Sequence, residues 1–142
     1  MKRHPAIAAL SRDHHHALVV AQRLRRATDD DGSAARAREK FLEYWRADGA
    51  QHFREEEEIL LPTFAGFGDV EAPVVARVLV DHVRIRRLAD ELAASETPPL
   101  TMLHDLGQRL ADHVRLEERE LFDLIERALP EDELVRLADV LT

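Results

Sequence analysis

The chain has 142 residues and a formal net charge of −8, and 45% of its residues are hydrophobic. This length and hydrophobic content suit a single domain, residues 1–142, with its own core. The negative charge argues against nucleic-acid binding, which relies on clustered lysine and arginine. Because the chain has no cysteine, disulfides, thiolate zinc sites and cysteine-ligated iron–sulfur clusters are excluded.

No apolar run in the sequence is long enough to cross a bilayer. Ser11, Arg12 and Asp13 interrupt the first apolar stretch too early for a signal peptide. We therefore expect a cytoplasmic protein without a membrane partner.

Ala, Leu, Val, Glu and Arg dominate the composition, which is typical of helices. Proline, glycine and short polar segments divide the chain into helical stretches, and Pro62 is expected to end the second of them. The predicted helices span approximately residues 5–27, 33–61, 73–94, 100–129 and 131–141. Short connections between long amphipathic helices predict an all-α fold, an antiparallel up-down-up-down four-helix bundle with a short C-terminal helix.

One order of polar residues occurs twice along the chain. The first copy is Asp13-His14 followed by His52-x-x-x-Glu56, and the second is Asp81-His82 followed by His113-x-x-x-Glu117. A spacing of four residues places an imidazole and a carboxylate one turn apart on the same helix face. The repeat predicts that the two halves of the bundle are equivalent in their arrangement.

These histidines and glutamates interrupt predicted apolar faces. The predicted faces are Ile7, Leu10, His14, Ala17, Leu18, Ala21 and Leu24; Phe41, Trp45, His52, Glu56, Ile59 and Thr63; Val75, Val78, His82, Ile85, Ala89 and Leu92; and Leu106, Leu110, His113, Glu117 and Leu124. A lone histidine on such a face is more often a hydrogen-bonded core residue than a ligand. Two buried carboxylates among four imidazoles, however, would be destabilising unless cations compensate them.

Imidazole and carboxylate donors without thiolate suit iron, manganese or zinc. Six donors are too many for one catalytic zinc, which takes three protein ligands, so they divide over two metals. Iron is favoured because this donor set can hold both Fe(II) and Fe(III), with an oxo or hydroxo bridge offsetting the remaining charge. The predicted metal ligands are His14 with His52, His82 with His113, and Glu56 and Glu117 as bridges. His15 is an alternative to His14, whereas the remaining histidines are expected at the surface.

Four segments carry a resemblance to a known family. They are Leu10-Ser-Arg-Asp-His14, His52-Phe-Arg-Glu-Glu56-Glu-Glu-Ile-Leu-Leu-Pro62, Asp81-His82 and His113-Val-Arg-Leu-Glu117-Glu-Arg-Glu-Leu-Phe122. In this order they resemble the hemerythrin-like (HHE cation-binding) domain family over nearly the whole chain. The resemblance implies a four-helix bundle with a non-haem di-iron centre. Members of the family carry oxygen, sense oxygen or redox state, store or handle iron, or repair iron centres damaged by nitric oxide.

The chain departs from the oxygen-carrying members at two positions. Arg86 stands where their third helix has a second histidine, and Glu117 lies four residues after His113, where they have a carboxylate five residues on. The four-His, two-Glu set is closer to the di-iron proteins linked to iron–sulfur repair, which usually carry an additional cysteine-containing N-terminal segment. We expect Arg86 to pair with Glu55 or another acidic residue near the site.

The sequence therefore predicts a non-haem di-iron protein that binds or senses oxygen, nitric oxide or redox state and signals through an unidentified protein partner. The alternatives are a di-iron enzyme, either oxidase, peroxidase-like or iron-centre repair, and a protein for iron storage or handling. A metal-free helical interaction module ranks last, because it would leave Glu56 and Glu117 buried without partners.

Overall fold

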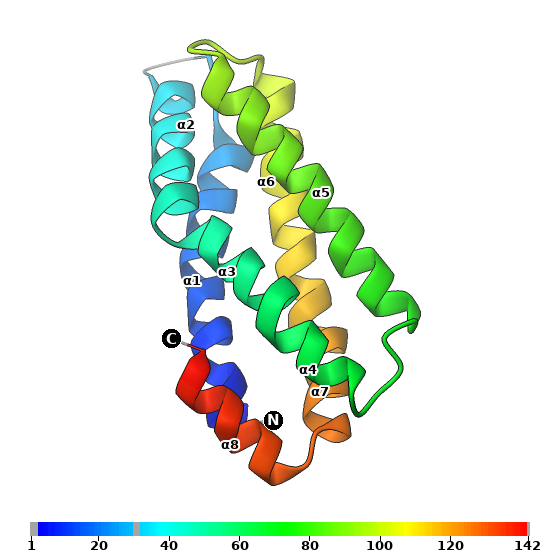
Figure 1. Ribbon diagram of the computed structural model, residues 1–142. Helices are drawn as coiled ribbons and strands as arrows, with labels where there is room; N and C mark the ends of the chain where they lie inside the picture. Colours follow the sequence, from blue (N-terminus) through cyan, green and yellow to red (C-terminus); the bar gives the residue numbers. More distant parts are fainter. Residues whose placement is uncertain (1–2, 30–31, 142) are drawn as a thin grey trace.

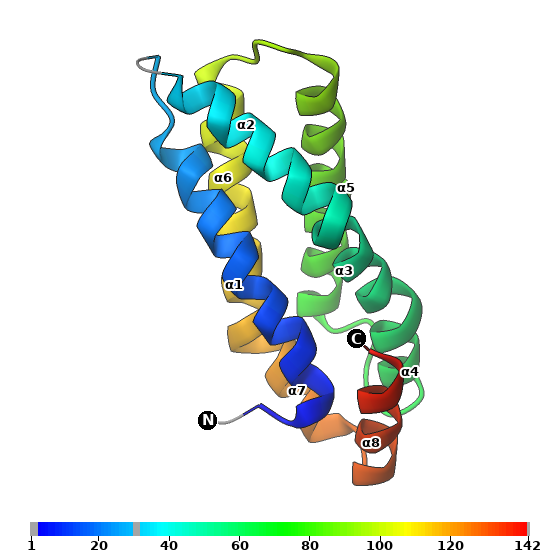
Figure 2. The ribbon, with the colours of Figure 1, turned by 90° about the vertical axis from the view of Figure 1, so that its left-hand side faces the viewer.

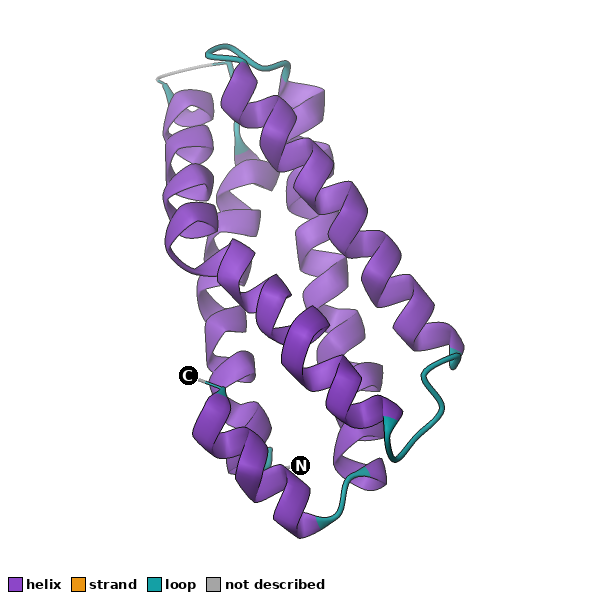
Figure 3. Cartoon of the chain, in the orientation of Figure 1, coloured by secondary structure: helices purple, strands orange, loops and turns teal. Residues whose placement is uncertain are grey.

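The computed structural model describes residues 3–29 and 32–141, and within these ranges it contains helices and turns but no strand (Figures 1 and 3). Its α-helices are α1 (Pro5–Arg26), α2 (Ser33–Tyr44), α3 (Ala50–Glu55), α4 (Leu61–Ala65), α5 (Pro73–Ala94), α6 (Leu100–Leu116), α7 (Phe122–Ala128) and α8 (Glu131–Val140). Three π-helical turns, η1 (Trp45–Gly49), η2 (Glu56–Leu60) and η3 (Glu117–Leu121), join some of them into longer rods. None of these helices is long and apolar enough to cross a membrane.

The helices form the predicted antiparallel bundle. The rods are α1, the run from α2 to α4, α5, and the run from α6 to α7. Figures 1 and 2 show them side by side in alternating directions, with α8 lying across the end of the bundle that holds the start of α1. The closest neighbours are α1 and α6, and α8 also packs on α1. The prediction of an all-α bundle with a short C-terminal helix is confirmed.

The core of the bundle consists of two apolar clusters. One lies at the α2 end of the bundle and includes Leu24, Phe41 and Leu106. The other lies at the α8 end and includes Leu10 and Phe64. A layer of buried polar residues separates them: His14, His52, Glu55, Glu56, His82, His113 and Glu117.

The three π turns change which residues face the core. In each turn the first carbonyl accepts a hydrogen bond from the N–H five residues later, as from Leu61 to Glu56. This wider turn contains one more residue than an α turn, so the face that follows is displaced by one position. Leu60 and Phe64 are therefore buried where the sequence predicted Ile59 and Thr63.

The same displacement follows η3, where Ile125 is buried and the predicted Leu124 is only partly so. In α1, which has no π turn, the predicted face is correct except at Leu18, which is 39% exposed. Val20 is buried in the core instead. Every residue of the face predicted for α5 is buried.

Pro62 does not end the second helix, which continues to Ala65. A proline inside an α-helix clashes with the carbonyl four residues before it and lacks the N–H that this carbonyl would bind. Here η2 ends at Leu60, two residues before Pro62, and widens the backbone just ahead of the proline. The π turn therefore accommodates the proline within the rod.

Gly107 allows α6 to approach α1 closely. A Cβ atom on Gly107 would lie 2.7 Å from the carbonyl oxygen of Ala21 and 2.9 Å from Cβ of Leu24. The first of these contacts is with backbone, which cannot move aside without displacing α1. The small residue is thus required by the packing of the two helices.

Replacing Gly107 with Ala is expected to lower the free energy of unfolding by about 1–3 kcal/mol, the usual cost of forcing an additional methyl group into a packed core. Gly66→Ala is the matched control, because its nearest neighbour would be the Thr63 carbonyl oxygen at an ordinary 3.5 Å. Chemical denaturation of both variants measures the difference. Equal stabilities would show that the α1–α6 contact does not depend on glycine.

Candidate metal centre

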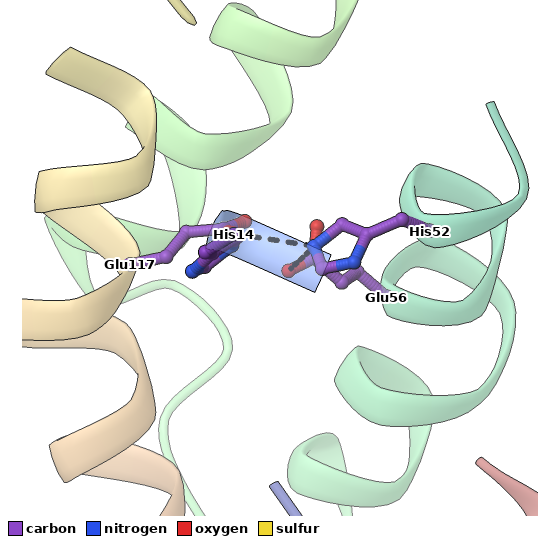
Figure 4. Close-up of side chains that lie close together, drawn as sticks. All are labelled: His14, His52, Glu56 and Glu117. Carbon is purple, nitrogen blue, oxygen red and sulfur yellow. Dashed lines mark hydrogen bonds and ion pairs between the residues drawn. The ribbon is translucent and has the colours of Figure 1, made fainter. Parts of the chain in front are cut away.

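All six residues predicted as metal ligands lie together in the polar layer. They are His14 from α1, His52 from α3, Glu56 from η2, His82 from α5, His113 from α6 and Glu117 from η3. We call these six the buried cluster. Figure 4 shows four of them, with the side chains of His14 and Glu117 facing those of His52 and Glu56 across the bundle. Glu56 and Glu117 are both 0% exposed.

The buried cluster divides into two groups that could each hold a metal ion. His14 and His52 form one group, His82 and His113 the other, and both groups include Glu56 and Glu117. Within a group the potential ligand atoms all lie within 4.8 Å of one another. Each glutamate thus faces both groups, as a bridging carboxylate must.

The distances within the cluster are short. Nε2 of His52 lies 3.2 Å from Oε2 of Glu56, and Nε2 of His82 lies 3.1 Å from Oε1 of the same carboxylate. Glu117 is placed in the same way: its Oε1 lies 2.9 Å from Nε2 of His14, and its Oε2 lies 3.0 Å from Nε2 of His113. All four imidazoles therefore direct Nε2 towards the two central carboxylates.

Most of these central atoms have no hydrogen bond. Nε2 of His52, His82 and His113, both carboxylate oxygens of Glu56, and Oε2 of Glu117 are buried without a hydrogen-bond partner among the described residues. Buried polar atoms are normally satisfied, and an unsatisfied one costs stability. A cluster of six such atoms, all nitrogen or carboxylate oxygen, fits the donor set of bound cations.

Each histidine is also held from the outside by a second carboxylate at Nδ1. The pairs are His14 with Glu118 at 2.7 Å, His52 with Asp13 at 3.1 Å, His82 with Glu57 at 2.6 Å, and His113 with Asp81 at 3.0 Å. We call Asp13, Glu57, Asp81 and Glu118 the outer carboxylates. An Nδ1–H that donates to a carboxylate leaves Nε2 as the lone pair for a metal, and it fixes the ring orientation.

The outer carboxylates follow the repeat in the sequence. Asp13 and Asp81 directly precede His14 and His82, yet each binds the histidine of the neighbouring helix in its own half. Glu57 directly follows Glu56, Glu118 directly follows Glu117, and each binds a histidine of the other half. None of these four residues was predicted to have a role in the site, although each stands directly beside a predicted ligand in the sequence.

An arginine and a phenylalanine also support each of His14 and His82, and these residues come from unrelated positions in the two halves. Arg86 binds Glu57 at 2.9 Å and lies over the ring of Phe53, which stacks on His82 at 3.8 Å. Arg86 thus pairs with Glu57, an acidic residue near the site, although not with Glu55. At the opposite corner, Arg3 lies 3.5 Å from Glu118 and over the ring of Phe122, which stacks on His14 at 5.4 Å.

The charges of the cluster shift the proton affinities of its members. Burial alone would lower the pKa of His82, but the carboxylates of Glu117 and Glu56 outweigh it and raise this pKa to about 9. Burial likewise opposes protonation of His113, but the charge of Glu117 and the hydrogen bond to Asp81 raise its pKa to about 10. Burial would raise the pKa of Glu117, yet the neighbouring histidines hold it well below the usual value. Without metal, protonated histidines are therefore the cations that compensate the buried glutamates.

The other histidines lie outside the buried cluster. His15, the alternative to His14, is exposed and belongs to neither group. His16 is exposed as expected and contacts Asp48 at 3.3 Å. His4 and His104 were also expected at the surface, but they are partly buried because each binds backbone at one end of α1. His4 accepts the N–H of Ala6, and His104 donates to the carbonyl of Ala27.

One class of metal-binding protein is the helical bundle that holds ions with side chains from facing helices. The four rods of this chain have such an arrangement of His and Glu side chains in their core. The sequence matches the hemerythrin HHE cation-binding domain over residues 6–125, which is most of the chain. The chain therefore belongs to this family, as its resemblance predicted. No curated protein and no solved structure matches the chain significantly.

Replacing Asp81 with Asn removes the charge that orients His113, so we expect metal affinity to fall roughly 10- to 100-fold. Asp90→Asn is the control, because Asp90 is exposed on the same helix and outside the cluster. Competition with a chromogenic chelator measures both affinities. If the two variants retain metal equally well, the outer carboxylates do not support the site.

The raised histidine pKa values predict how the stability of the metal-free protein depends on pH. A group whose pKa is raised on folding stabilises the folded state fully below its unfolded pKa, about 6.5, and this contribution is lost as the pH rises through the folded pKa. For His82 and His113 the folded pKa values are about 9 and about 10. The free energy of unfolding of the metal-free protein should therefore decrease between about pH 7 and pH 10.

The metal-loaded protein is the control, since metal ions take the place of the protons on Nε2. Its stability should decrease less over the same range, as measured by denaturant titration at each pH. Parallel curves for the two forms would contradict this account.

Proposed function

We propose that the protein holds two iron ions in the buried cluster and binds or senses oxygen, nitric oxide or redox state through them. His14 and His52 would hold one ion and His82 and His113 the other, with Glu56 and Glu117 bridging. Two iron ions supply Fe(II)/Fe(III) redox chemistry and coordination positions for a diatomic ligand. The chain belongs to a cation-binding family, and the metal, the ligand and the role are our proposal.

The observation that carries the proposal is the set of buried atoms without hydrogen bonds, which belong to two fully buried carboxylates and three imidazoles. In a metal-free interaction module, only protons on the histidines could compensate the two buried carboxylates in the centre of the core. Each group offers two imidazoles and two carboxylates, which suits iron and leaves positions for a small ligand. The outer carboxylates would orient the imidazoles and raise their basicity.

The residues of the chain have defined tasks under this proposal. The four histidines direct Nε2 inwards, and the two central glutamates neutralise the positive charge of the ions. The apolar clusters above and below the layer keep bulk water from the centre. An oxidase, peroxidase-like or repair enzyme would use the same residues, and turnover of peroxide or nitric oxide by the iron-loaded protein separates that alternative from a binding protein.

The first experiment measures metal content and the visible absorption spectrum of freshly purified protein, in air and after anaerobic reduction. We expect about two irons per chain and a charge-transfer band that is lost on reduction. One zinc per chain or no metal would contradict the proposal.

Variants assign the ligands. His14→Ala and Glu56→Gln are expected to lose iron while keeping the helical circular dichroism spectrum, because the bundle is held by two apolar clusters on either side of the layer. His15→Ala is the matched control, since it removes the adjacent but exposed imidazole. Full iron stoichiometry in His14→Ala or Glu56→Gln would exclude the changed residue as a required ligand.

A further inference from the structure

A groove of about 600 Å³ runs along the surface between α5 and the rod of α6 and η3. Its positively charged lining residues are Arg77, Arg84, Arg109, Arg115 and Arg119. Only three carboxylates line it with them, those of Asp81, Asp112 and Glu120. In a chain with a net charge of −8, an excess of cations in one groove is a local feature that the overall charge does not explain.

Three of these arginines pair with a carboxylate, and two have no such partner among the described residues. Arg109 pairs with Asp105 at 3.1 Å. Arg77 pairs with Glu120 at 2.7 Å, and Arg115 pairs with Asp112 at 3.0 Å. By contrast, Arg84 and Arg119 form no hydrogen bond or ion pair with any residue that the structure describes. An unpaired guanidinium offers a fork of N–H donors that matches carboxylate or phosphate oxygens.

The two unpaired arginines belong to opposite ends of the groove. The contact of Arg77 with Glu120 fixes one end, and Arg119 is the neighbour of Glu120 in the chain. Arg84 lies seven residues beyond Arg77 on α5, roughly 10 Å along the helix. The antiparallel direction of α6 brings Arg109 to the same end as Arg84.

The lining between the two ends of the groove is mixed. Val80 from α5 and Leu116 from α6 give it apolar surface, and Asp81 and the ion pair of Asp112 with Arg115 also line it there. Val80 is 46% exposed, so apolar surface is open to a ligand there. The volume is in the range of small-molecule sites.

We propose that this groove binds a small organic molecule with an anionic group, carboxylate or phosphate, at each end of an uncharged body. Arg84 and Arg119 bind the two ends, and Val80 and Leu116 contact the body. Asp81 lines the groove and also accepts the hydrogen bond of His113, so the ligand lies beside a support of the buried cluster. This site is separate from the proposed iron centre, and its test does not require iron.

Isothermal titration calorimetry of the purified protein at low salt tests the proposal with two probes. Azelate carries a carboxylate at each end of an apolar chain, and fructose 1,6-bisphosphate carries a phosphate at each end of a sugar. Nonanoate and fructose 6-phosphate are their controls with one anionic end. We expect at least one two-ended probe to bind at least about fivefold more tightly than its control, the upper range for one exposed ion pair.

The variant Arg84→Gln/Arg119→Gln should remove this preference. The control variant Arg46→Gln/Arg127→Gln removes the same charge at exposed positions outside the groove and should keep it. Whichever probe binds shows whether carboxylate or phosphate is the preferred end group.

Three results would overturn the proposal. One is that neither two-ended probe binds better than its control. Another is that the Arg84/Arg119 variant binds as tightly as the unchanged protein. The third is that a single-stranded oligonucleotide binds with the same dependence on Arg84 and Arg119 while both small probes fail, which would make nucleic acid the occupant.

Discussion

Two glutamates at the centre of the core impose the main constraint on this protein. Glu56 and Glu117 are fully buried, and moving a carboxylate out of water costs several kcal/mol unless positive charge compensates it. Four imidazoles surround these carboxylates and four further carboxylates hold the imidazoles from outside. The layer is thus a set of alternating charges, and it interrupts a core that would otherwise be one continuous apolar cluster.

The backbone also departs from regular geometry beside this layer. The π turns η2 and η3 begin at Glu56 and Glu117, and π turns within α-helices are frequent at functional sites. His52 and His113 lie before these turns, and the buried glutamate is the first residue of each turn. After each turn, the displaced helix face still packs in the apolar cluster at the α8 end. A regular α-helix would direct Ile59 and Thr63 into the core in place of Leu60 and Phe64.

The sequence predicts the class of fold, the rods and the six residues of the buried cluster, because helical periodicity and the His-x-x-x-Glu spacing act over one or two turns. It does not predict the π turns, because the predicted faces assume the regular α-helical period throughout each rod. The outer carboxylates were missed for a related reason. Asp13 and Glu57 bind histidines on other helices, so their roles depend on how the rods are placed.

The two halves of the centre are equivalent in outline but differ in how they are supported. Arg86 and Phe53 hold Glu57 and His82 from within the bundle, whereas Arg3, from the segment before α1, has the corresponding role beside Glu118. Glu57 and Glu118 are each 29% exposed, so neither corner is fully closed to water. Arg86 therefore acts on the buried cluster through Glu57 and His82 and cannot itself be a metal ligand, because a guanidinium has no lone pair to donate.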